Sequence, residues 1–301
     1  MNIAVLSDIH ANYIAFKNAI DFLKTKNIDA YCILGDYSGE FPGICETLDL
    51  IYELQTRYPV YIIKGNREDY LLRGLGNEHP EWDEYPSTVG MMRYNHTYMR
   101  EKDWEFIKAL PETFTLKLEG MEELLLCHGS PRNVKEPIHK GNPENKDIYS
   151  ATEAKYILCG HAHRCMDFNE LGKHILNPGS VGEPLDDGRH DYSAFMILHS
   201  VGKEWNAEQI YLKQDMNLIV KDIMEHNLHN IAPYWALSVE SFCRGGDMSN
   251  GHILSRAMDI TKEETGECNW PAIPEEYWAR AFRELVIDRQ PEIYENMTLK
   301  T

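Results

Sequence analysis

Five polar turns, each directly after a short apolar run, constrain the fold of this chain more than any other feature. The first three apolar runs, 1–7, 31–34 and 60–63, are separated by stretches whose apolar residues recur at helical spacing. Strands that alternate with helices in this way form a parallel sheet with crossover helices. Because ligands bind at the carboxyl ends of such strands, we expect the polar turns to surround one site.

The side chains in these turns are suited to bind metal ions. Carboxylate and amide oxygens together with imidazole nitrogens are the ligand mix that suits Mn, Fe, Zn or Ni. In an extended turn, residues i and i+2 project to the same side, so Asp8 and His10 are expected to face one cavity. The same spacing applies to His161 and His163. The candidate ligands are Asp8, His10, Asp36, Asn66, His128, His161 and His163.

Seven ligands on several strand ends suit a dinuclear centre, in which one carboxylate bridges two ions about 3.5–4 Å apart. Two carboxylates would leave part of the cationic charge uncompensated, so the centre could attract a phosphate and acidify a bound water. The net charge of −18 and the lack of a basic stretch argue against nucleic acid as a partner. A small phosphorylated substrate is compatible with this acidity, because bound divalent ions reverse the field locally.

The second half of the chain predicts a second sheet and a helical tail. Short apolar runs with little helix between them favour a second sheet that faces the first, and they lie at 114–118, 124–127, 156–159, 174–176 and 193–198. From residue 214 the pattern is mostly helical, and the stripe at Tyr277, Trp278 and Phe282 is expected to pack on the main domain or on a second subunit. We therefore expect a domain at 1–213 and a helical C-terminal extension at 214–301.

Five motifs in a fixed order resemble those of the calcineurin-like metallophosphoesterases. They are Asp8-x-His10, Gly35-Asp36, Gly65-Asn66-x-Glu68, His128 and Gly160-His161-x-His163. The segments 127–131 and 177–182 look like signatures of the small prokaryotic branch of that family. The resemblance covers residues 1–213. It implies an α/β fold, a two-sheet sandwich flanked by helices, and metal-dependent hydrolysis of phosphomonoesters or phosphodiesters by a metal-bound hydroxide.

The resemblance also implies how the ligands are divided between two divalent transition-metal ions. One ion would be held by Asp8, His10, Asp36 and His163. The other would be held by Asp36, Asn66, His128 and His161, so that Asp36 would be the bridging carboxylate.

The chain departs from the family pattern at Arg67, where many members have a histidine that helps to protonate the leaving oxygen or to steady the phosphoryl group. Arginine cannot act as an acid near neutral pH, but it can bind phosphate oxygens with two donors. The resemblance implies catalytic roles for Asn66, Arg67 and His128, and substrate contacts for Asn12 and Arg67. A milder departure is Ala11, which stands where the family usually has glycine.

Three classes of function fit these features. The first is a metal-dependent phosphatase or phosphodiesterase, which the complete set of ligands favours. The second is a catalytically silent metal-binding scaffold that acts through protein–protein contacts, and the third is a metal-dependent nuclease, which the acidity disfavours. No apolar run approaches the roughly 18 residues of a membrane span, and the N-terminus has no signal-peptide pattern. We therefore expect a cytoplasmic protein without a membrane partner, and a homo-oligomer is possible.

Overall fold

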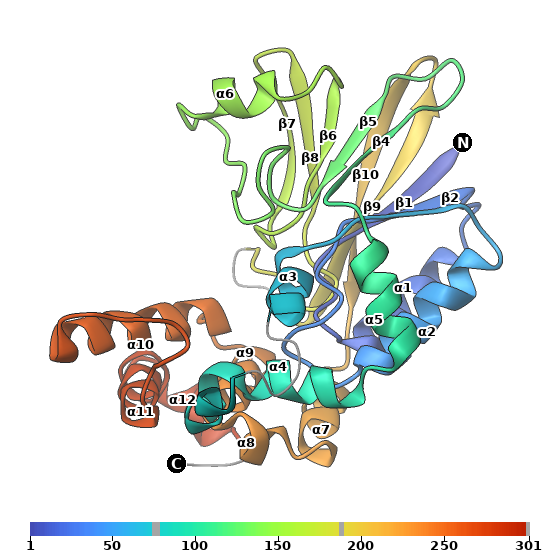
Figure 1. Ribbon diagram of the computed structural model, residues 1–301. Helices are drawn as coiled ribbons and strands as arrows, with labels where there is room; N and C mark the ends of the chain where they lie inside the picture. The colour runs from blue at the N-terminus through green and yellow to red at the C-terminus, as the bar shows by residue number, and fades with distance from the viewer. Residues whose placement is uncertain (74–78, 187–189, 299–301) are drawn as a thin grey trace.

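Two five-stranded mixed sheets form the centre of the molecule (Figure 1). The computed structural model describes residues 1–73, 79–186 and 190–298. The first sheet has the strand order β10-β9-β1-β2-β3, and β1, β2 and β3 are parallel. Its strands are β1 (Asn2–Leu6), β2 (Ala30–Ile33), β3 (Val60–Ile62), β9 (Tyr192–Val201) and β10 (Glu204–Lys213). The crossover helices are α1 (Tyr13–Leu23) and α2 (Ile44–Gln55), which confirms the predicted βαβαβ opening.

The second sheet has the strand order β4-β5-β6-β8-β7, and its central strands β5, β6 and β8 are parallel. Its strands are β4 (Thr113–Leu116), β5 (Leu124–Cys127), β6 (Tyr156–Leu158), β7 (Cys165–Glu170) and β8 (Lys173–Pro178). The carboxyl ends of the parallel strands in both sheets are followed by the polar turns, so the two sheets contribute residues to one region.

Side-chain alternation along the strands explains the sandwich. In β1, Ile3 and Val5 face the core between the sheets, where they pack with Leu126 and Leu176 from the second sheet. Residues of the opposite parity, such as Leu6, face the core beneath α1 and α2 instead. A strand that is apolar at both parities is buried on both faces, and β1 is covered by the second sheet on one face and by helices on the other. Figure 1 shows α1 and α2 on the outer face of the first sheet.

One strand placement predicted from the sequence is wrong. The run 193–198 was expected in the second sheet, but it belongs to β9, which pairs antiparallel with β1 in the first sheet. The physical reason is the long hairpin that β9 forms with β10, a strand that the apolar runs do not reveal. Only Trp205 in β10 is fully buried, and polar side chains occupy most of the strand, as is typical of a sheet edge.

The remaining helices occur along the chain between β3 and β4, after β5, and in the tail. The segment between the sheets contains α3 (Asn66–Arg73), a 3-10 turn (Pro80–Glu84), α4 (Pro86–Tyr98) and α5 (Glu101–Ala109), and α6 (Asn145–Ser150) follows β5. The tail contains α7 (Met216–Glu225), α8 (Leu228–Ile231), α9 (Pro233–Cys243), α10 (Asn250–Thr265), α11 (Glu275–Phe282), a π-helical turn (Arg283–Ile287) and α12 (Pro291–Glu295). None of the helices within the described ranges has the length and hydropathy that a membrane span requires.

The tail shares an apolar core with the rest of the chain. Trp278 and Phe282 of the predicted stripe are fully buried, in a cluster that also contains Trp235. Met91 from α4 and Phe41 from the segment after β2 belong to the same cluster. The stripe therefore packs within the chain, and the tail helices gather beside α4 (Figure 1).

Candidate metal centre

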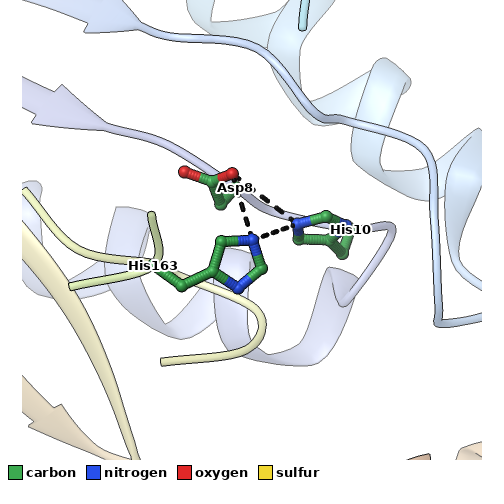
Figure 2. A group of neighbouring side chains, drawn as sticks. All are labelled: Asp8, His10 and His163. Atoms are coloured by element: carbon green, nitrogen blue, oxygen red, sulfur yellow. Dashed lines mark hydrogen bonds and ion pairs between the residues drawn. The ribbon is translucent and has the colours of Figure 1, made fainter. Parts of the chain in front are cut away.

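Three side chains from two turns converge at the end of β1. The Nε2 atom of His163 lies 3.2 Å from Asp8 Oδ1 and 2.9 Å from His10 Nε2, as Figure 2 shows. His10 Nε2 lies 3.7 Å from the same carboxylate oxygen. All three side chains are buried, and one ligand atom of each lies within 4.8 Å of those of the other two. This arrangement brings together residues that are 153 positions apart in the chain.

A second group adjoins the first and shares Asp8 with it. His128 Nε2 lies 3.3 Å from Asp36 Oδ2 and 3.8 Å from Asp8 Oδ1. The amide oxygen of Asn66 is 3.1 Å from the same imidazole nitrogen. Asp36 Oδ2 is also 3.8 Å from His10 Nε2. Both carboxylates therefore lie between imidazoles of the two groups, as a pair of neighbouring ions would require.

The donor atoms of this cluster fit divalent metal ions. Asp8 Oδ1 is buried and receives no hydrogen bond of acceptable geometry from any described residue, although three imidazole Nε2 atoms lie 3.2 to 3.8 Å away. Hydrogen bonds on the outer side of the rings fix their orientation: His128 Nδ1 faces Leu34 O at 2.7 Å, and His163 Nδ1 faces Glu183 O at 2.8 Å. A carbonyl can only accept, so each Nδ1 carries a proton, and Nε2 is the nitrogen of each ring that faces the carboxylates and would bind a metal ion.

The turns that carry these side chains have left-handed backbone. Asp8, His10, Asp36, His161 and His163 all have φ between 53° and 64°. The prediction of extended turns is therefore wrong. Asp8 and His10 nevertheless converge, whereas His161 and His163 do not enter the same group of ligand atoms. Left-handed residues other than glycine are costly, and they cluster at functional sites where the surrounding structure enforces them.

Glu68 holds two of the turns in place. Its carboxylate accepts hydrogen bonds from the backbone N–H groups of Asp36, Tyr37, Ser38 and Gly65, at 2.8 to 3.1 Å. A Cβ atom at Gly65 would collide with the Asp36 carboxylate, which explains why glycine stands before Asn66. Glu68 therefore fixes the turn after β2 against the turn after β3.

The segment 177–182 ties the second sheet to Asp8. Asn177 Nδ2 donates to Gly160 O at 2.7 Å, and Ser180 Oγ donates to Asp8 O at 2.7 Å. Ser180 Oγ also accepts from the backbone N–H of Glu183 at 2.8 Å. The hydroxyl of Ser180 is thus part of a tight turn that supports the ligand residues.

The electrostatic state of the cluster follows from its buried charges. Burial alone would raise the pKa of Asp36, but His128 and His10 hold it well below the usual range. Burial alone would lower the pKa of His128, but Asp36 and Asp8 raise it to about 9. Metal ions bind neutral imidazole, so they would compete with a proton on His128.

His161 lies beside the two groups rather than within them. Its backbone N–H donates to Asp8 Oδ2 at 3.0 Å, and its ring stands edge-on to His128 with the centroids 5.3 Å apart. Burial and the neighbouring His128 lower its pKa to about 4, so the ring is neutral at physiological pH. A neutral imidazole at this distance is available to a metal ion, and its role as a ligand stays a prediction.

The two residues expected to contact substrate have different surroundings. Asn12 is buried, caps α1 by accepting from Ala15 N at 3.1 Å, and donates to Gly182 O at 3.1 Å. Arg67 begins α3 beside Asn66, and its backbone N–H donates to Asp36 Oδ1 at 2.8 Å. Its side chain is 26% exposed. Substrate contact by either residue stays a prediction.

Sequence reasoning missed two buried carboxylates next to the ligands, Glu40 and Glu183. Glu40 Oε2 lies 2.5 Å from His10 Nδ1, and Glu183 Oε2 lies 3.6 Å from His163 Nδ1. Glu40 lies four residues after Asp36 in the segment that follows β2. Its acidic side chain close to a candidate ligand is the sequence feature that could have pointed to it. No spacing rule would have shown that it faces His10.

Comparisons with known proteins agree with this fold. The model of the calcineurin-like phosphoesterase superfamily domain matches residues 1–201. An uncharacterised protein of Methanocaldococcus jannaschii is 23% identical over 248 residues, which cover 77% of this chain and 94% of the relative. The crystal structure of a hypothetical protein from Pyrococcus horikoshii is similar with a TM-score of 0.66 and 23% identity, over 78% of this chain and 97% of that one. A metallophosphoesterase from Sphaerobacter thermophilus gives a TM-score of 0.61 at 18% identity, over 77% and 98% of the two chains.

Proposed function

The chain belongs to the calcineurin-like phosphoesterase superfamily, and from this membership we propose that it is a metal-dependent phosphoesterase with a dinuclear centre. The observation that carries the proposal is the pair of adjoining donor groups, Asp8 with His10 and His163, and Asp8 with Asp36 and His128. Buried carboxylates that face several imidazole nitrogens are suited to hold metal ions. We propose the full ligand set with Asn66 and His161 added, and Asp36 as the bridge.

The proposed chemistry is hydrolysis of a phosphomonoester or phosphodiester bond. Two bound divalent ions such as Mn, Fe, Zn or Ni would supply a nucleophile from water and neutralise charge on the phosphoryl group. Arg67 would bind phosphoryl oxygens with its guanidinium group, and Asn12 would contribute an amide hydrogen. We propose that residues 1–213 carry this chemistry and that residues 214–301 form an extension packed upon them.

The experiment that tests this function is a metal titration of turnover. Chelator-treated protein should not hydrolyse bis-p-nitrophenyl phosphate or p-nitrophenyl phosphate, and added Mn²⁺ should restore turnover of at least one of them. Metal binding without turnover of either compound would instead favour the silent-scaffold alternative. Detection of a stable covalent phosphoenzyme would contradict direct attack by water.

A further inference from the structure

Glu40 connects a metal-ligand histidine with Arg67. Its side chain is completely buried, and its two oxygens serve different partners. Oε2 lies 2.5 Å from His10 Nδ1, while Oε1 accepts a hydrogen bond from Arg67 Nη2.

The contact to His10 differs from those of the other two imidazoles in the donor groups. His128 and His163 direct Nδ1 at backbone carbonyls, Leu34 O and Glu183 O. His10 Nδ1 instead lies 2.5 Å from Glu40 Oε2, in an ion-pair contact that does not have hydrogen-bond geometry. A carboxylate behind a ligand histidine fixes its tautomer and raises its basicity more than a neutral carbonyl does. Gly39 leaves room for this contact, because a Cβ atom there would lie 2.5 Å from His10 Nδ1.

The guanidinium group of Arg67 is held on a second side by the tail. It lies over the ring of Trp235, 5.5 Å from the centroid, and Trp235 is a buried residue of α9. Phe41, the residue after Glu40, belongs to the same apolar cluster as Trp235. Glu40 therefore contacts the proposed metal centre, and the next residue, Phe41, packs in the apolar cluster of the tail.

We propose that Glu40 is a positioning residue that couples the metal ligand His10 to the phosphate-binding Arg67, and that Trp235 makes the C-terminal extension part of this arrangement. This inference rests on the proposed function of the site. The Glu40 carboxylate balances the charge of Arg67 and takes up one of its Nη2 donors, which fixes the guanidinium group and leaves other donors of its two terminal nitrogens for a phosphate. Trp235 favours the same orientation through a cation–π contact.

The test measures binding of Mn²⁺ and of inorganic phosphate by calorimetry, so it does not depend on turnover. Glu40→Gln should weaken Mn²⁺ binding about tenfold, the lower end for loss of a carboxylate behind a ligand histidine. It should also weaken phosphate binding to the Mn²⁺-loaded protein. Trp235→Leu should leave Mn²⁺ binding unchanged and weaken phosphate binding about threefold, as expected for a partly exposed cation–π pair.

Glu240 provides a matched control for a purely structural effect. It is another completely buried glutamate with a histidine and an arginine beside it, His229 at 3.1 Å and Arg244 at 3.6 Å. Glu240→Gln removes a similar buried charge from the tail without a contact to the ligand residues. It should lower the thermal unfolding temperature but leave both affinities unchanged.

The outcomes separate this inference from the proposed function. Unchanged Mn²⁺ and phosphate affinities in Glu40→Gln would overturn it, and so would equal losses in Glu240→Gln. A native protein that binds Mn²⁺ but no phosphate would overturn the role of Arg67. If Glu40→Gln does not fold, Trp235→Leu decides, and unchanged phosphate affinity there contradicts the inference. If the affinities change as expected but nothing is hydrolysed, the inference holds and the proposed function fails.

Discussion

At the scale of single residues, the candidate metal centre concentrates backbone strain. Among the described residues, eight other than glycine have positive φ, and six of them are Asp8, His10, Ala11, Asp36, His161 and His163. Each such residue costs on the order of 1–3 kcal/mol, so the surrounding structure must enforce the conformation. Glu68 does so for the turns after β2 and β3 through its bonds to four backbone N–H groups.

The raised pKa of His128 links the stability of the metal-free protein to pH. Its folded pKa is about 9, against about 6.5 for an unfolded histidine. The stabilisation from the protonated ring is complete below the unfolded pKa and is lost as the pH rises through about 9. We expect the Tm of chelator-treated protein to fall between about pH 7 and pH 9.5, and to fall less in His128→Gln. Identical pH slopes of Tm in the two proteins would contradict this origin of the effect.

Arg67 should restrict the leaving groups that the proposed enzyme accepts. An arginine stabilises charge but cannot pass a proton, so esters whose leaving group needs little protonation should be favoured. We expect kcat/KM to depend steeply on leaving-group pKa across a series of aryl and alkyl esters, and Arg67→His to flatten that dependence. Equal slopes would place Arg67 outside the path of the proton.

At the scale of elements, the strands and helices with a strong apolar pattern can be predicted from the sequence. The strands β1, β2 and β3 and the helices between them are apparent because buried parallel strands form continuous apolar runs. β7 and β10 lie at the edges of their sheets, where polar residues alternate with apolar ones, so a search for apolar runs misses them. Long-range pairing is likewise hidden, and for this reason the run 193–198 was placed in the wrong sheet.

The same limit applies to the site. The ordered turns predict which residues gather at the metal centre, because they follow strands whose ends must meet. They do not reveal that Glu40 stands behind His10, or that Trp235, 168 positions after Arg67, covers its guanidinium group. Such contacts depend on how the tail packs, and no local pattern encodes that packing.

The packing of α4 against α8 should be sensitive to a single methyl group. Gly90 lies within α4, and a Cβ atom there would collide with the carbonyl oxygen of Ile231. Alanine normally stabilises a helix by roughly 0.5–1 kcal/mol over glycine, but here we expect Gly90→Ala to destabilise the protein by about 1–3 kcal/mol. The matched control is Gly251→Ala in α10, where the nearest atom is 3.6 Å away. Urea denaturation that shows equal effects for both variants would contradict this packing.

At the scale of the whole molecule, the tail covers apolar surface of the main domain. Phe41, Met91 and Tyr94 are buried in the cluster that the tail helices complete. We expect truncation after Gln214 to expose this surface and to promote aggregation, while Mn²⁺ binding is retained. Light scattering and calorimetry of the truncated chain would measure both. A monodisperse truncated protein with unchanged thermal stability would show that the tail is an independent appendage.

The central claim is a dinuclear centre in which Asp36 bridges two ions. The most direct measurement is the metal content per chain, by mass spectrometry of metals after Mn²⁺ loading and gel filtration, together with turnover of bis-p-nitrophenyl phosphate, for the native protein and Asp36→Asn. We expect two ions per chain in the native protein. The Asp36→Asn variant should have native circular dichroism but a reduced metal content. Its turnover should be lowered at least about 100-fold, because a lost carboxylate ligand removes transition-state stabilisation of several kcal/mol. An Asp36→Asn protein that keeps two ions per chain and near-native turnover would contradict it.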